Sequence, residues 1–467
     1  MRKDKERAIF EDRSVLSAVL RLALPTVLGQ IILVVYNMAD TFFIGCTGND
    51  AMLSAVTICM PAFLFLSAIS NLFGVGGAGV IARAYGAGQT ERVRDASALA
   101  FWGCLAGTFF YVLLVFLLMD PFVRLLGGLH RDVHAFAASY LRITVVGGGL
   151  FTALSSLFSH LIRAEGRSGA AGFGIMLGGV LNIILDPLFM FRLMPPGQEI
   201  AGAALATALS NLISFAYFMG ALLILRRRSR LSLKPCRGML SSPLVRELLS
   251  AGLPACIMTL FENISYAFLD RLTANYGIAA QAGLGVAKKI NMLAHCIVRG
   301  VAQGAMPLVA YSFAARRMDR LKAASRTIRY FAIGSAALCA AVFFIFCRPL
   351  CGLFIHTESP SLDYAAAFLR ILCLGCPFSA AAYSIISFFQ ATGEGGKSFR
   401  LAVLRKGLLD IPLMFLLGAL FPVFGPVAAT PVTDFVCSFA AYMVFFRYMG
   451  RIGSPEKAFG LKKRRTA

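Results

Sequence analysis

Residues 22–45 read LALPTVLGQIILVVYNMADTFFIG, an apolar run that contains a single acid, Asp40. A helix of about 20 apolar residues is long enough to cross the hydrocarbon core of a membrane. The run is continuously apolar and lacks the alternation of a membrane β-strand. It therefore predicts a transmembrane helix that carries one carboxylate inside the membrane.

Similar runs recur along the whole chain, which has 467 residues, 58% of them hydrophobic, and a mean hydropathy of +0.74. We expect an all-α integral membrane protein with twelve transmembrane helices. An even number of spans places both termini on the same side of the membrane. The expected spans are residues 16–43, 52–78, 97–119, 134–160, 168–192, 201–225, 249–274, 281–311, 328–350, 364–391, 398–421 and 426–447.

The basic residues predict the orientation. The chain has a net charge of +22, and 35 of its 45 Lys and Arg residues lie at the two termini and in or beside the even-numbered loops. Basic loops stay in the cytoplasm, so we expect both termini there, in a multi-pass protein of the bacterial inner membrane. We attribute the net charge to this topology and to contact with anionic lipids rather than to nucleic acid.

The second half of the sequence repeats the first. LRITVVG at 141–147 matches LRILCLG at 369–375, and GAALATALSN at 202–211 matches GPVAATPVTD at 425–434. Six spans per repeat give the halves a parallel orientation, related by a pseudo-two-fold axis along the membrane normal. We expect an N-terminal bundle at 1–225, a cytoplasmic linker at 226–248, and a C-terminal bundle with a basic tail at 249–467.

Two patterns in the sequence match motifs of nucleotide-binding, metal or redox sites, but their place in membrane helices argues against that chemistry. Gly74–Gly79 fits G-x-G-x-x-G but ends a membrane helix, where small residues allow close packing. Cys373 and Cys376 form a lone C-x-x-C inside an apolar run, which indicates packing rather than metal or redox chemistry. We find no P-loop, no nucleophile motif and no selectivity filter, and so expect neither an enzyme nor a channel.

The pattern resembles the multidrug and toxic compound extrusion (MATE) family over nearly the whole chain. The resemblance is carried by residues 22–45, quoted above, and by ARAYGAGQ at 82–89, RAEGRS at 163–168, LNIILDPLFM at 181–190 and GAALATALSN at 202–211. It implies a secondary antiporter that exports small, often cationic, organic molecules in exchange for Na⁺ or H⁺, with no cofactor. The alternative that it leaves open is a flippase for lipid-linked oligosaccharides, which belongs to the same superfamily.

Asn182 and Asp186 are four residues apart, which places both on one face of the fifth span. Buried carboxylates usually face a cavity, a partner or an ion. Carboxylate, amide and hydroxyl oxygens suit Na⁺, and close carboxylates can also carry H⁺. The resemblance places a cation site at Asp40, Asn182, Asp186 and Thr207; the alternative is that these groups only hydrogen-bond neighbouring helices.

Three more residues are candidates for the substrate cavity. Glu262 lies in the middle of the seventh span, where some family members use an acid. Tyr36 and Asn37 lie one turn before Asp40, although Tyr36 fits an ordinary helix contact better. The acid that family members tend to have in the tenth span is missing here, which argues against a cation site in the C-terminal half. We expect a monomer.

Overall fold

The computed structural model describes residues 9–11, 14–128, 130–225, 229–355 and 359–452. Within these ranges the chain is helical and has no β-strand. The basic residues 226–228 and the basic tail 453–467 lie outside the described residues.

The N-terminal half contains six spans. They are α2 (Val15–Gly45), α3 (Asp50–Gly86), α4 (Thr90–Leu117) followed by the short α5 (Met119–Leu125), the bent span α6 (Arg131–Leu141), η1 (Arg142–Gly147) and α7 (Gly149–Ala164), α8 (Ser168–Leu188) continued by η2 (Phe189–Leu193), and α9 (Glu199–Leu225).

The C-terminal half repeats this order. After the short η3 (Arg237–Leu240) come α10 (Ser242–Ala274), α11 (Ile278–Ala314), α12 (Met318–Ile345) followed by α13 (Cys347–Gly352), the bent span α14 (Pro360–Leu374) and α15 (Cys376–Thr392), the span α16 (Gly395–Val403), η4 (Leu404–Leu409) and α17 (Asp410–Leu420), and α18 (Gly425–Ile452).

All twelve predicted spans are present. Among the described residues, nine single helices are long and apolar enough to cross a membrane, and counting each bent pair as one span gives eleven. The twelfth is the segment in which η4 separates α16 from α17. The bends of 49° between α6–η1 and α7 and of 42° between α14 and α15 fall at glycines 147–149 and at Gly375-Cys376-Pro377, sequences that interrupt regular helical hydrogen bonding.

The outer surface is strongly apolar. Large side chains such as Phe110, Ile224, Leu338 and Phe446 are each more than 60% exposed. A water-soluble monomer rarely exposes so much apolar surface. The chain is therefore a multi-pass membrane protein whose outer face meets lipid.

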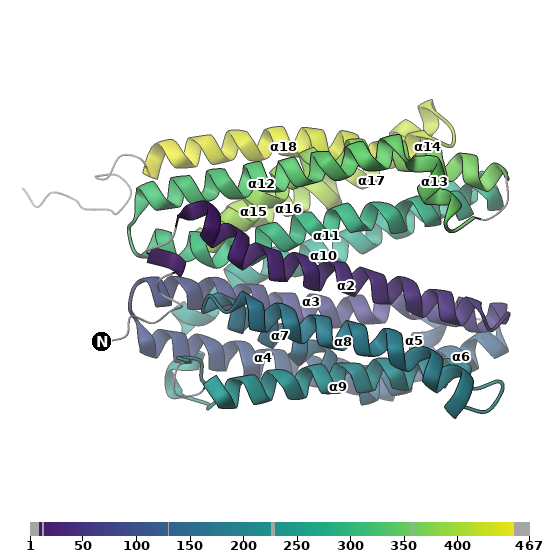
Figure 1. Cartoon of the computed structure of the whole chain (residues 1–467), viewed down its shortest axis with the longest axis horizontal. Helices are drawn as coiled ribbons and strands as arrows, with labels where there is room; N and C mark the ends of the chain where they lie inside the picture. Colours follow the sequence, from purple (N-terminus) through teal and green to yellow (C-terminus); the bar gives the residue numbers. More distant parts are fainter. Residues whose placement is uncertain (1–8, 12–13, 129, 226–228, 356–358, 453–467) are drawn as a thin grey trace, which may run out of the picture.

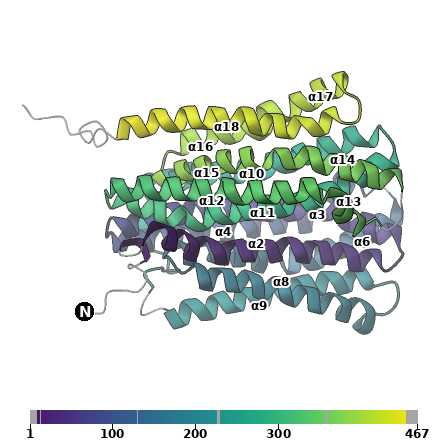
Figure 2. The same cartoon turned by 45° about the horizontal axis from the view of Figure 1, so that its top comes forward.

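The two halves lie side by side (Figure 1), and the view from behind shows the same division. They run in parallel, as the pseudo-two-fold axis along the membrane normal requires. The start of α2 and the end of α18 lie at one end of the bundle. Between the halves α2 packs beside α11 (Figure 2), and α3 packs against α10.

Glycines let these central helices approach closely. An added Cβ on Gly252 of α10 would lie 1.8 Å from the carbonyl oxygen of Leu72 on α3, and one on Gly304 of α11 would lie 2.8 Å from Cα of Ala23 on α2. Real Cβ atoms essentially never come that close to backbone atoms. The two halves therefore meet backbone to backbone toward the end of the molecule where α2 begins.

Polar groups join the halves at the same end. Arg83 of α3 forms an ion pair with Glu247 of α10 at 3.0 Å and donates hydrogen bonds to the carbonyl oxygens of Gln390 and Ala391, at the end of α15, at 3.1 and 2.8 Å. Arg83 thus ties one half to two helices of the other. The two halves are therefore held together at this end of the molecule, which the predicted topology places on the cytoplasmic side.

Candidate functional site

The four predicted cation ligands lie together inside the N-terminal half. The Asn182 amide donates to Oδ1 of Asp186 at 3.1 Å and to Oγ1 of Thr207 at 3.2 Å. Asp40 lies near enough to Asp186 for their charges to interact. The structure therefore brings residues from α2, α8 and α9 into one cluster, which we call the N-half cluster: Asp40, Asn182, Asp186 and Thr207.

Helix packing explains why these residues meet. Gly172 and Gly179 are two turns apart on α8 and face α2, where added Cβ atoms would lie 2.4 Å from the carbonyl oxygen of Pro25 and 2.5 Å from Ile32. Gly202 of α9 faces the backbone of Phe189, just after α8, at 2.9 Å. These small residues bring the three helices close enough for short polar side chains to reach one another.

The cluster is buried and has unsatisfied oxygens. Asp186 is fully buried, and Asp40, Asn182 and Thr207 are each less than 9% exposed. Within the described part of the chain, Oδ1 of Asp40, Oδ1 of Asn182 and Oδ2 of Asp186 have no hydrogen-bond partner. Among the residues that the structure describes, neither carboxylate forms a salt bridge. Two buried carboxylates without a basic partner are costly unless a proton or a metal cation joins them.

Tyr140 contacts the N-half cluster, and the sequence analysis did not predict this contact. Its hydroxyl donates to Oδ2 of Asp40 at 3.5 Å. It comes from α6, 100 positions along the chain from Asp40, and nothing in the local pattern pointed to it. Pro187, directly after Asp186, lacks an N–H group and so leaves the carbonyl oxygen of Ile183 without its helical donor.

Among the described residues, neither Tyr36 nor Asn37 forms a side-chain hydrogen bond with a member of the N-half cluster. The Asn37 amide donates to the carbonyl oxygen of Leu33 in its own helix at 2.6 Å. The ring of Tyr36 lies beside Gly179, 3.4 Å from where a Cβ would be. Tyr36 therefore takes part in the contact between α2 and α8, and it also lies near enough to Asp40 and Asp186 for their charges to act on it.

Four acids of the C-terminal half, Glu262, Asp270, Asp410 and Asp434, are arranged differently, because each has a basic partner. Glu262 pairs with Arg299 of α11, so it brings no uncompensated negative charge. Asp410 pairs with Lys406 at 2.8 Å, Asp434 with Arg405 at 2.7 Å, and Asp270 with Lys288. Arg405 and Lys406 belong to the basic residues from which the sequence predicts the cytoplasmic side, but they are buried, as are Arg83 and Arg163 of the same set.

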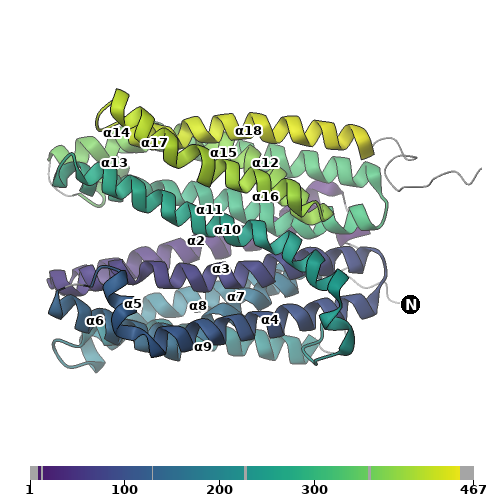
Figure 3. The same ribbon diagram turned by 180° about the vertical axis from the view of Figure 1, so that it is seen from behind.

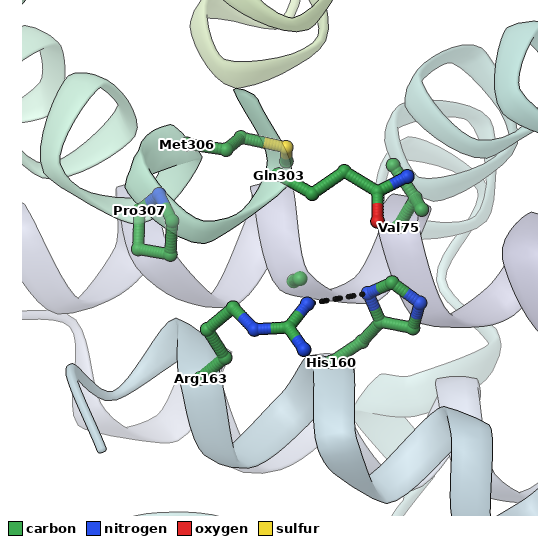
Figure 4. Close-up of a pocket in the computed structure, with 7 residues that line it drawn as sticks. Val75, His160, Arg163, Gln303, Met306 and Pro307 are labelled. Atoms are coloured by element: carbon green, nitrogen blue, oxygen red, sulfur yellow. Dashed lines mark hydrogen bonds between the residues drawn. The ribbon is translucent and has the colours of Figure 1, made fainter. Parts of the chain in front are cut away.

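A second buried polar feature lies between the halves (Figure 4). Arg163 and His160 of α7 face Gln303, Met306 and Pro307 of α11 across a cavity of ≈ 10 Å³, room for about one water molecule. Nη1 of Arg163 lies 3.4 Å from Nδ1 of His160, while its Nε and Nη2 have no hydrogen-bond partner among the residues that the structure describes. The RAEGRS motif contained this residue, but sequence reasoning gave it no role.

The comparisons with known proteins agree with this architecture. A family model described as MatE matches the chain twice, once in each half, over residues 25–188 and 254–416. The chain belongs to the MATE family. This is a family of transporters, and the paired match repeats the internal two-fold pattern.

Curated relatives match almost end to end. The chain is 27% identical over 457 residues to the multidrug export protein MepA of Staphylococcus aureus (strain NCTC 8325), covering 96% of this chain and 98% of that protein. It is 25% identical over 450 residues to MepA of Staphylococcus saprophyticus, with the same coverage.

Solved structures share the fold. A crystal structure of MATE in complex with MaL6 superposes with a TM-score of 0.89 at 22% identity, covering 97% of this chain and 100% of that one. An outward-facing multidrug resistance MATE family transporter of the MOP superfamily superposes with a TM-score of 0.87 at 21% identity, again over 97% and 100%. The predicted twelve-helix, two-bundle fold is therefore confirmed.

Proposed function

We propose that this chain is a secondary active exporter of small organic molecules, often cationic, and that Na⁺ or H⁺ drives it through the N-half cluster. The observation that carries the proposal is the pair of buried carboxylates, Asp40 and Asp186, that has no basic partner. A cation or proton supplies the missing positive charge. The relatives named multidrug export proteins support the choice of cargo, and their end-to-end match favours export over lipid flipping.

The donor set fits either coupling ion. Na⁺ prefers hard oxygen ligands, and the unsatisfied oxygens of Asp40, Asn182 and Asp186 are of this kind. A proton shared between the two carboxylates would instead remove their mutual repulsion. Either ion lowers the energetic cost of burying two carboxylates without a basic partner. We therefore propose one site for the coupling ion, and experiment must distinguish Na⁺ from H⁺.

Coupling requires that the ion favour one conformation over another. A ligand shifts an equilibrium only by its differential affinity for the two states. The ligands come from α2, α8 and α9, and α2 also packs against α11 of the other half. A change in how α2 sits on α8 therefore reaches the contact between the halves, which we propose as the route from ion binding to alternating access.

We further propose that the chain functions as a monomer in the bacterial cytoplasmic membrane, with both ends of the chain inside. A cysteine at position 230 should then resist a membrane-impermeant thiol reagent in intact cells, and one at position 49 should react, in a background without native cysteines. The charge distribution is the reason. Reaction at position 230 in intact cells would reverse the orientation.

The proposed function can be tested by the efflux of a lipophilic cationic dye from cells that express the chain. Efflux should stop when ionophores collapse the Na⁺ and H⁺ gradients while cellular ATP is maintained. It should continue when ATP is depleted and the gradients are held. Efflux that follows ATP instead would rule out secondary transport.

A further inference from the structure

The internal repeat gives the N-half cluster a counterpart in the C-terminal half. At an offset of 224 residues, Asp186 corresponds to Asp410 and Asn182 to Lys406, and at an offset of 223 Thr207 corresponds to Thr430. One of the two carboxylates of the N-half cluster, that of Asp186, and the hydroxyl are thus kept in both halves. The amide of the N-terminal half is replaced by an ammonium group in the C-terminal half.

The geometry around Asp410 resembles an occupied site. Nζ of Lys406 lies 2.8 Å from Oδ2 of Asp410, and the Ser265 hydroxyl of α10 donates to the same oxygen at 2.5 Å. The side chains of Lys406 and Asp410 are 4% and 0% exposed. Oγ1 of Thr430, the counterpart of Thr207, is buried in the same half and has no hydrogen-bond partner among the described residues.

A neighbouring pair keeps the surroundings neutral. Nε of Arg405 lies 2.7 Å from Oδ1 of Asp434, and its Nη2 donates to Ser379 at 2.6 Å. Arg405 is therefore held by Asp434. This leaves Lys406 as the cation that compensates Asp410.

An ammonium group carries the same charge as Na⁺, and a lysine on the same helix has a far higher effective concentration than any free ion. A diffusible cation can displace it only by leaving a buried ammonium without a partner, which costs several kcal/mol per ion. The carboxylate of Asp410 is thus always compensated. Asp186, by contrast, depends on an ion from solution.

We propose that the C-terminal half contains a second monovalent cation site of the same design, permanently occupied by the ammonium group of Lys406. The chain then binds one coupling cation per cycle, in the N-terminal half, while the C-terminal half does not respond to the ion. The number of coupling cations per cycle rests on the proposed function. The occupancy of the second site by Lys406 concerns the C-terminal half alone.

Removing the lysine should uncover the site. The full-length protein would carry Asp40→Asn and Asp186→Asn to silence the N-half cluster, and binding of radiolabelled Na⁺ would be measured in lipid nanodiscs. We expect no binding in this background, one Na⁺ per chain after Lys406→Asn is added, and loss of that binding after Asp410→Asn is added as well. Lys288→Asn is the matched control: it removes a lysine from a more exposed carboxylate, Asp270, and should create no site.

Two results would overturn the inference. One is a folded Lys406→Asn protein that binds no Na⁺, and the other is Na⁺ binding in the starting background that Asp410→Asn removes. Should the asparagine variant fail to fold, Lys406→Gln takes its place with the same expectations. If neither Lys406 variant folds, Na⁺ binding by the native chain tests the inference instead. The native chain should bind no more than one Na⁺, and any Na⁺ that it binds should still bind after Asp410→Asn. Na⁺ gained through Lys406→Asn while the native chain binds none would leave this inference standing and count against Na⁺ at the N-half cluster.

Discussion

Replacing either Asp40 or Asp186 by asparagine should abolish gradient-driven export. Asparagine keeps the size and hydrogen-bonding capacity of the side chain but removes the charge that the coupling ion needs. Each 1.4 kcal/mol of lost ion binding lowers the affinity tenfold, and we expect the transport rate to fall about tenfold or more in each single variant. Since the two carboxylates act on one ion, the double variant should be little worse than either single one.

The measurement is substrate accumulation in liposomes with an imposed ion gradient. Asp120→Asn is the matched control, because the Asp120 side chain is 73% exposed in the short helix α5, and it should transport normally. Substrate binding without a gradient should survive in all variants, which separates loss of coupling from loss of folding. Wild-type rates in both Asp40→Asn and Asp186→Asn would remove the N-half cluster from the mechanism.

Adding a single methyl group at Gly252 should prevent the halves from closing at the end that Arg83 also joins. The new Cβ would lie 1.8 Å from the carbonyl oxygen of Leu72, so α3 and α10 must move apart. Overpacking of this kind costs about 1–3 kcal/mol, which shifts the balance away from the closed state by about 5-fold to 150-fold. We therefore expect Gly252→Ala to export poorly although its ion ligands are intact.

Spin labels at positions 87 and 242, on the exposed ends of α3 and α10, would report the distance between the halves. The distance should increase in Gly252→Ala. Gly334→Ala on α12 is the control, since a Cβ there has nothing within 4 Å. An unchanged distance together with normal export would show that this glycine contact does not limit closure.

The spans could be predicted because each is a local property of the sequence. Length and hydropathy define a membrane helix without reference to its neighbours. The pairing of Asn182 with Asp186 was predictable for the same reason, since both lie on one turn of one helix. The breaks at glycines 147–149 and at Gly375-Cys376-Pro377 were also visible as residue types, although not their angles.

Partners that come from other helices could not be predicted. Arg299 lies 37 positions from Glu262 and pairs with it only because α11 packs near α10. Arg405 and Lys406 adjoin a basic loop and were counted with it, but the π-helical segment η4 carries them into the bundle. The single most useful clue was available: the repeat aligns Lys406 with Asn182, and a lysine at such a place is rarely left without a carboxylate.

The central claim is that drug movement and cation movement are coupled in opposite directions through the N-half cluster. It is tested most directly by imposing a gradient of a cationic substrate across liposomes that contain the purified chain and following radiolabelled Na⁺ and internal pH. We predict that the substrate gradient drives Na⁺ or H⁺ the opposite way, and that Asp186→Asn stops this flux. Substrate movement without a counterflow of either ion would contradict the account.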